Sequence, residues 1–107
     1  MYLKVAYSAV IARRAKSDMS EINAYITDEL YNPEAALKLL DDIYSQVISL
    51  KQMPKQFALV SDERLALLGI RSIPVKNHLI FYTVDDTTKT VNVVRVLNFR
   101  RDWGNLL

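Results

Sequence analysis

The spacing of apolar residues changes twice in the first third of the chain. Residues 2–7 alternate in the manner of a strand with one better-buried face, whereas from residue 9 to residue 30 apolar side chains recur every three or four positions. Ser8 stands between the two patterns and offers a side-chain oxygen as a helix N-cap, although Asp18 with Glu21 has the capping-box spacing for a restart. A first strand followed by one long amphipathic helix is therefore predicted.

A second helix is expected immediately after the first. Asn32 is a good N-cap, Pro33 fits the first helical position and Glu34 suits the positive end of the helix dipole. A broad apolar face then continues to about Lys51, and Met53-Pro54 ends the helix. Because so few residues separate the two helices, they must fold back as an antiparallel hairpin.

The remaining pattern indicates strands. Residues 55–68 give no clear signal beyond a possible helical turn ending at Gly69, but residues 70–75, 78–84 and 90–97 are rich in β-branched and aromatic side chains. Pro74 marks the first of these as an edge strand or a bulged one, and the third is apolar on both faces, as a central strand would be. Residues 100–107 would close the chain as a short helix or turn.

The predicted fold class is α+β, in the order β-α-α-β-β-β with a short C-terminal helix or turn. The tight connections make the last three strands antiparallel neighbours, and the first strand must join the same sheet to satisfy its backbone groups. The helical hairpin would cover one face of this mainly antiparallel sheet. At 107 residues, half of them hydrophobic, we expect one domain spanning 1–107.

Composition excludes several kinds of site. The chain has no cysteine, one histidine and two distant glycines, so neither a thiolate nor a metal site nor a phosphate-binding loop is expected, and we predict no cofactor. The serines lack a nucleophile motif. No export signal and no apolar run long enough for a membrane span is evident, so a cytoplasmic protein is expected.

Positive charge is concentrated in the second half. Residues 1–54 hold six Lys or Arg against seven Asp or Glu, whereas residues 55–107 hold eight against five. One interpretation is a cationic rim that holds a polar or anionic target, and the target-binding candidates are Arg71, Lys76, Arg95, Arg100, Arg101 and Trp103. The alternative is that Arg71 and Arg95 simply pair with carboxylates inside the fold, and the sequence does not decide between the two.

Metal-free chemistry on RNA is a further possibility. His78 and Tyr82 share one face of their predicted strand, and either could move a proton while arginines stabilise a charged phosphorus centre. An aromatic residue in a strand is nevertheless more often part of a core.

The second face of the sheet has no predicted cover. Strand alternation places four apolar side chains there and so predicts an exposed patch that a partner protein covers. An acidic segment that is disordered until it binds would suit both the patch and the charge. The candidate contacts are Ile70, Ile80, Val94 and Val96.

Taken together, these motifs resemble the RelE/ParE superfamily of type II toxin–antitoxin toxins, most closely its ParE branch. The resemblance covers nearly the whole chain. It is carried by Tyr7-Ser8, Asn32-Pro33-Glu34-Ala35-Ala36, Leu50 through Pro54, Gly69-Ile70-Arg71, Val75, Leu79-Ile80-Phe81-Tyr82, Val84-Asp85, Arg95-Val96-Leu97, Arg101-Asp102-Trp103 and Leu106-Leu107.

The resemblance implies a cytoplasmic growth inhibitor that a cognate antitoxin neutralises, with operator DNA contacted only through the antitoxin. Two mechanisms occur on this fold: ParE-like poisoning of DNA gyrase, which would make the protein no enzyme, and RelE-like ribosome-dependent mRNA cleavage, a metal-independent endoribonuclease activity. A non-toxic antitoxin-binding module is a further alternative.

The C-terminal tail favours the gyrase mechanism, although Asn98-Phe99 stands where the ParE branch more commonly has His-Gly. The Tyr or His that a RelE-like nuclease would carry near its C-terminus is missing. If the chain were nevertheless a nuclease, the candidate residues would be Arg64, Arg71, His78, Tyr82, Arg100 and Arg101.

Overall fold

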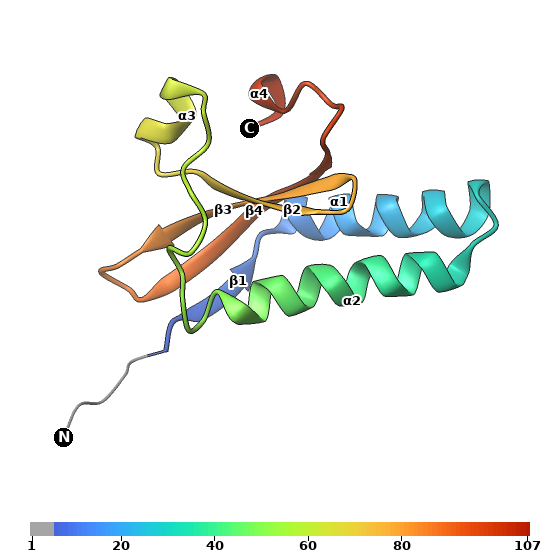
Figure 1. Ribbon diagram of the computed structural model, residues 1–107, viewed down its shortest axis with the longest axis horizontal. Helices are drawn as coiled ribbons and strands as arrows, with labels where there is room; N and C mark the ends of the chain where they lie inside the picture. The colour runs from blue at the N-terminus through green and yellow to red at the C-terminus, as the bar shows by residue number, and fades with distance from the viewer. Residues whose placement is uncertain (1–5) are drawn as a thin grey trace.

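A computed structural model describes residues 6–107 as a four-stranded sheet with helices on both faces (Figure 1). The elements in chain order are β1 (Ser8–Ile11), α1 (Arg13–Ala24), the π-helix η1 (Tyr25–Glu29), α2 (Pro33–Ser49), α3 (Glu63–Leu67), β2 (Arg71–Val75), β3 (His78–Asp85), β4 (Thr90–Asn98) and α4 (Trp103–Leu106). This α+β architecture confirms the predicted fold class.

The strand order in the sheet is β1-β4-β3-β2. β2, β3 and β4 form an antiparallel meander, and β1 pairs in parallel with β4, from Ser8 opposite Thr90 to Ile11 opposite Val93. As predicted, β2 with Pro74 is an edge strand and β4 lies in the interior of the sheet. The parallel pair is possible because the long helical hairpin connects β1 to the rest of the sheet.

The boundary between the first strand and the first helix differs from the prediction. Ser8 is the first residue of β1 rather than a helix cap, and α1 begins at Arg13 after Ala12, which makes no side-chain capping bond. The amides of Ser8 and Ala12 donate instead to the carbonyls of Lys89 and Val93. Pairing with the central strand thus outweighs the local capping preference. The predicted strand residues 2–5 lie outside the described part of the chain.

The helical hairpin forms as its sequence predicts. The Asn32 side chain accepts a hydrogen bond from the amide of Ala35, and Pro33 occupies the first turn of α2. Asp18 does not restart a helix, because it lies in the middle of α1 and is buried. The residues expected to end the first helix instead form the wider turns of η1, where the amide of Leu30 donates to the carbonyl of Tyr25.

The main core lies between this hairpin and the sheet. Ala15 and Met19 of α1 and Leu39, Ile43 and Val47 of α2 pack against the inward side chains of the strands. Among those strand residues Ile80, Tyr82, Val91 and Val93 are fully buried. The strand residues that line this core therefore cannot meet a partner without opening the fold.

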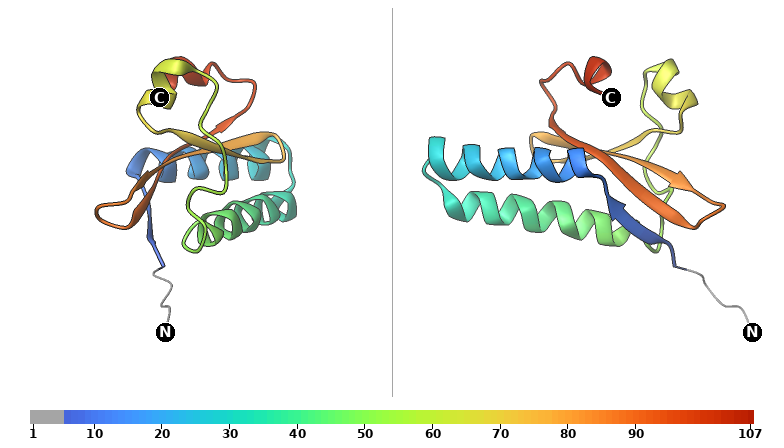
Figure 2. Two further views of the ribbon diagram at one scale, coloured as in Figure 1. Left: turned by 60° about the vertical axis from the view of Figure 1, so that its left-hand side comes forward. Right: turned by 180° about the vertical axis from the view of Figure 1, so that it is seen from behind.

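A second, smaller core covers the other face of the sheet. α3 and α4 lie on the side opposite the hairpin (Figures 1 and 2), and the side chains of Leu65, Phe81, Leu97 and Trp103 pack together there. Asp62 caps α3, and Gly69 ends it with a φ of +79°, a conformation that favours glycine. Residues 55–68, for which the sequence pattern predicts no clear structure, thus help to cover this face of the sheet.

The predicted open apolar face is therefore wrong. Ile80 and Val96 are buried under the hairpin, whereas Ile70 is buried and Val94 half-buried in the second core. The pairing of β3 with β4 shifts between Phe81 and Tyr82, which leaves a bulge in β4 and breaks the strict alternation used to assign faces. The same bulge separates Val93 and Leu97 into different cores, although they are four positions apart in one strand.

Candidate functional site

The helical hairpin is longer than the sheet that it covers (Figures 1 and 2). The side chains at this overhanging end line a cleft of about 580 Å³. We call it the junction cleft, because it lies between the hairpin, the β2–β3 turn and the C-terminal end of β4. Its hairpin side is mainly apolar and comprises Ile22, Tyr25, Ile26, Leu30, Ala35 and Leu39. Its polar lining comprises Asp18, Glu21, Lys76, Asn77, His78, Asn98 and Arg101.

Asn98 holds one wall of the junction cleft in place. Its side-chain oxygen accepts from the amide of Arg100 at 2.9 Å, and its carbonyl accepts from the amide of Arg101 at 3.0 Å. The amide of Phe99 donates to the carbonyl of Asn77 at 2.9 Å, which ties the tail to the β2–β3 turn. The Asn98-Phe99 turn therefore brings Arg101 to the cleft.

His78 is a half-buried titratable group in the lining of the cleft. Its Nδ1 atom is buried and has no hydrogen-bond partner within residues 6–107. Burial lowers the pKa of His78 below its ordinary value, since the charged imidazolium is poorly solvated there. The side chain is thus a neutral imidazole at pH 7, able to accept or donate one hydrogen bond to a ligand.

Arg95 is an internal brace and not a surface contact. Its Nε and Nη2 atoms donate to the two carboxylate oxygens of Asp18 at 2.8 and 2.9 Å, and Nη1 donates to the carbonyl of Leu106 at 2.9 Å. Asp18 also accepts from the amide of Val96, where β4 extends past the end of β1. The hydrogen bonds with Asp18 raise the pKa of Arg95. This pair links α1, β4 and α4.

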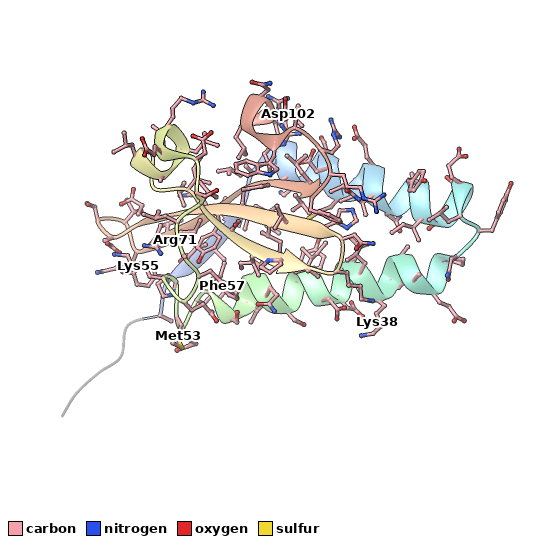
Figure 3. The ribbon with its side chains drawn as sticks, turned by 45° about the horizontal axis from the view of Figure 1, so that its top comes forward. Lys38, Met53, Lys55, Phe57, Arg71 and Asp102 are labelled. Atoms are coloured by element: carbon pink, nitrogen blue, oxygen red, sulfur yellow. The ribbon has the colours of Figure 1, made fainter. Side chains whose placement is uncertain are left out.

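Arg71 likewise serves the fold. Its Nη1 atom donates to the carbonyl of Phe57 at 2.7 Å, and Figure 3 shows Arg71 beside Phe57 in the loop that follows α2. In the sheet it stands opposite Tyr82. Arg71 therefore anchors the loop to the beginning of β2. The junction cleft lies at the other end of this strand, where Lys76 follows Val75.

Only part of the predicted cationic rim is accessible. Lys76 is exposed, and its Nζ atom lies 3.9 Å from a carboxylate oxygen of Asp42. Arg101 is exposed at the cleft. Arg100 is also exposed, with its guanidinium over the ring of Phe99 at 5.6 Å. Trp103 is half-buried and packs on Phe81 with ring centroids 5.3 Å apart, so it belongs to the second core.

The residues predicted for a nuclease site do not all lie together in the structure. His78 and Arg101 line one cleft, but Tyr82 is fully buried and lies four residues further along β3, about 13 Å away. Burial raises the pKa of the Tyr82 hydroxyl, against smaller opposing effects of Arg71 and of the Phe57 backbone. No group in the described chain makes a well-aligned hydrogen bond with this hydroxyl. Arg64 donates to the carbonyl of Gly104 and joins α3 to α4. These residues form no common centre.

Sequence reasoning missed the contribution of α1 and η1 to the cleft. Asp18 carried a usable signal, because it lies three residues after Ala15 and four before Ile22 and so falls on the apolar stripe of its helix. A carboxylate in that position requires a cation. Tyr25 and Leu30 carried no such signal, because their exposure depends on how far the hairpin overhangs the sheet.

Within residues 6–107, no group of three or more potential metal-ligating side chains lies close enough together to hold an ion. None of the described helices has the length and apolar character needed to cross a membrane.

Solved structures of toxin–antitoxin proteins share this fold. The chain superimposes on a chain of the chromosomal ParDE toxin–antitoxin system of P. aeruginosa with a TM-score of 0.70 and 26% identity, covering 87% of this chain and 96% of that one. A chain of the RelBE2 toxin–antitoxin complex of Mycobacterium tuberculosis gives 0.65 and 18%, covering 88% and 99%. A free mutant of E. coli toxin RelE gives 0.63 and 13%, covering 95% and 93%. The two latter similarities concern the fold alone.

No curated protein shows significant similarity to the sequence. A sequence profile described as "ParE toxin of type II toxin-antitoxin system, parDE" nevertheless matches residues 9–103, which is most of the chain. The chain therefore belongs to the ParE toxin family of type II toxin–antitoxin systems.

Proposed function

We propose that this protein is a cytoplasmic toxin that arrests growth by poisoning DNA gyrase and is held inactive by a cognate, acidic antitoxin. The proposal rests on the match to the ParE family over residues 9–103, with the similarity to a ParDE chain in support. Operator DNA would be contacted only through the antitoxin.

The arrangement of the arginines supports a toxin that binds its target and does not cleave it. Arg71 and Arg95 are committed to contacts within the fold, and Tyr82 is buried, so the side chains needed for phosphoryl transfer are not gathered. Lys76 and Arg101 remain exposed at the junction cleft, and Arg100 is exposed next to Arg101 in the chain. We assign target binding to this cationic edge.

The test is DNA supercoiling by purified gyrase with increasing amounts of the protein, followed by detection of trapped, cleaved DNA. We expect loss of supercoiling and accumulation of cleaved DNA, and adding the antitoxin should reverse both. Unimpaired supercoiling at a toxin excess over gyrase would refute the gyrase target.

One observation favours RNA cleavage as a second candidate. His78 and Arg101 line the same cleft. A neutral imidazole can accept a proton there while a guanidinium stabilises the charge that develops on a phosphate. Translating ribosomes with mapped mRNA ends would reveal this activity. Cleavage in the ribosomal A site that disappears in His78→Gln would establish the nuclease, whereas intact mRNA is expected for the gyrase poison.

A further inference from the structure

The solvent-facing side of α2 carries an apolar stripe that no described element covers. Leu37, Tyr44 and Ile48 are 64%, 47% and 60% exposed. They are separated by seven and four residues, so they lie on one side of the helix, beside the buried side formed by Ile43 and Val47. Figures 1 and 2 show α2 as the outermost element of its layer. A row of large apolar side chains in such a position is typical of an interface.

The charges along the stripe have opposite signs at its two ends. Glu34 lies in the first turn of α2, and Lys51 follows its last turn. At 100° per residue Glu34 lies within a quarter-turn of the stripe, as does Asp41 beside Tyr44. Lys51 lies in the turn that follows the C-cap residue Leu50, at the other end of the stripe. Neither Glu34 nor Lys51 takes part in an ion pair within the described residues. Their charges are therefore free for a partner.

We propose that this stripe binds the same stripe of a second copy of the chain. If two α2 helices pack antiparallel about a two-fold axis, the residue numbers that face each other add up to 85. Leu37 then meets Ile48 of the second copy, Asp41 meets Tyr44, and Glu34 meets Lys51. Every contact occurs twice, as a two-fold interface requires. The sequence is self-complementary in both its apolar and its charged positions.

The charges also speak against an acidic antitoxin as the occupant of this stripe. Glu34 lies at the first turn of the stripe, so an acidic helix would meet a like charge there. A second copy instead offers one cation to each end. Because a single helix pair buries less surface than a stable dimer interface, half of the protein should be dimeric only at about 100 μM. The inference concerns the toxin alone and does not depend on its target.

Sedimentation equilibrium of the purified chain over a range of concentrations tests the interface. We expect a reversible dimer, and Leu37→Glu should weaken it by at least about tenfold because it buries a charge against Ile48. Leu67→Glu is the matched control, since Leu67 is 89% exposed on α3, away from the stripe. A monomer at every concentration, or equal weakening by both variants, would overturn the proposal.

A charge exchange tests the antiparallel register. Glu34→Lys and Lys51→Glu should each weaken the dimer, because each places like charges opposite one another, and the double variant should restore it. Circular dichroism confirms that the fold is unchanged. If the double variant is weaker than either single one, Glu34 and Lys51 do not face each other and the proposed register is wrong.

Discussion

Arg95 and Arg101 stand six positions apart, yet they differ in almost every physical respect. Arg95 is 8% exposed, and its guanidinium donates hydrogen bonds to the carboxylate of Asp18 and to the carbonyl of Leu106. Arg101 is exposed at the rim of the junction cleft. The carboxylate that fixes Arg95 is 77 residues away in the sequence, so nothing close to either arginine distinguishes them. Burial, and not local sequence, therefore separates the brace from the site.

The largest effect is expected at the brace. Arg95→Ala would leave the Asp18 carboxylate buried with only the Val96 amide as a donor. Loss of one partner of a buried ion pair typically costs about 3–5 kcal/mol, and we expect a decrease of this size in the free energy of unfolding. Urea denaturation measures it directly.

The control for this prediction replaces both charges. Asp18→Leu combined with Arg95→Met removes the pair without leaving an isolated charge, so it should recover most of the lost stability. If Arg95→Ala costs less than about 1 kcal/mol, the pair is no more than a surface contact and the distinction between the two arginines fails.

A selective effect on toxicity is expected at the cleft. Arg100→Ala with Arg101→Ala should relieve growth arrest, because it removes two exposed cations from the proposed target-binding edge, yet change the free energy of unfolding by less than about 0.5 kcal/mol. Colony counts after induction, together with unfolding curves, separate the two effects.

Arg13→Ala with Arg14→Ala provides the matched comparison. It removes the same charge from exposed positions at the start of α1. Growth arrest should persist in this variant. Equal relief in both double variants would mean that net charge, and not the cleft, determines toxicity.

The fold was more accessible from the sequence than the site. Element order, the Asn32 cap and the edge position of β2 follow from local patterns that the structure keeps. The assignment of Ser8 and the faces of Ile80 and Val96 were wrong because they depend on pairing with distant strands. The bulge in β4 shifts side chains from one face to the other, and a strict period of two does not reveal it.

The site was accessible only in part, since two of the residues assigned to it are placed by tertiary contacts. The exposure of Arg101 and Lys76 was predictable because cations in turns are visible in the sequence. Arg95 and Trp103 were grouped with them, although one pairs with Asp18 and the other packs on Phe81. Whether a residue is free to bind a target or stabilises the fold depends on which distant side chains pack against it.

A smaller effect is expected from His78. Its pKa is lower in the folded state than in the unfolded one, so the unfolded state binds the proton more readily. The free energy of unfolding should be unaffected above about pH 6.5 and should fall as the pH drops below that value. Thermal unfolding of the protein and of His78→Gln at several pH values measures the difference, and parallel curves for the two would contradict it.

The smallest effect on stability is expected from Tyr82→Phe. The hydroxyl is buried without a hydrogen-bond partner, so its removal should leave the free energy of unfolding at pH 7 unchanged or raise it by up to about 1 kcal/mol. Because burial raises the pKa of this group, the unfolded state loses the phenolic proton more readily than the folded state. The free energy of unfolding of the parent should therefore fall as the pH rises above about 10. The variant should therefore lose less stability in alkali than the parent. Tyr31→Phe, at an 86% exposed position, should behave like the parent.

Growth arrest should persist in Tyr82→Phe, since a tyrosine inside the core cannot reach a target. If the variant has parental stability but no longer arrests growth, Tyr82 takes part in the functional site.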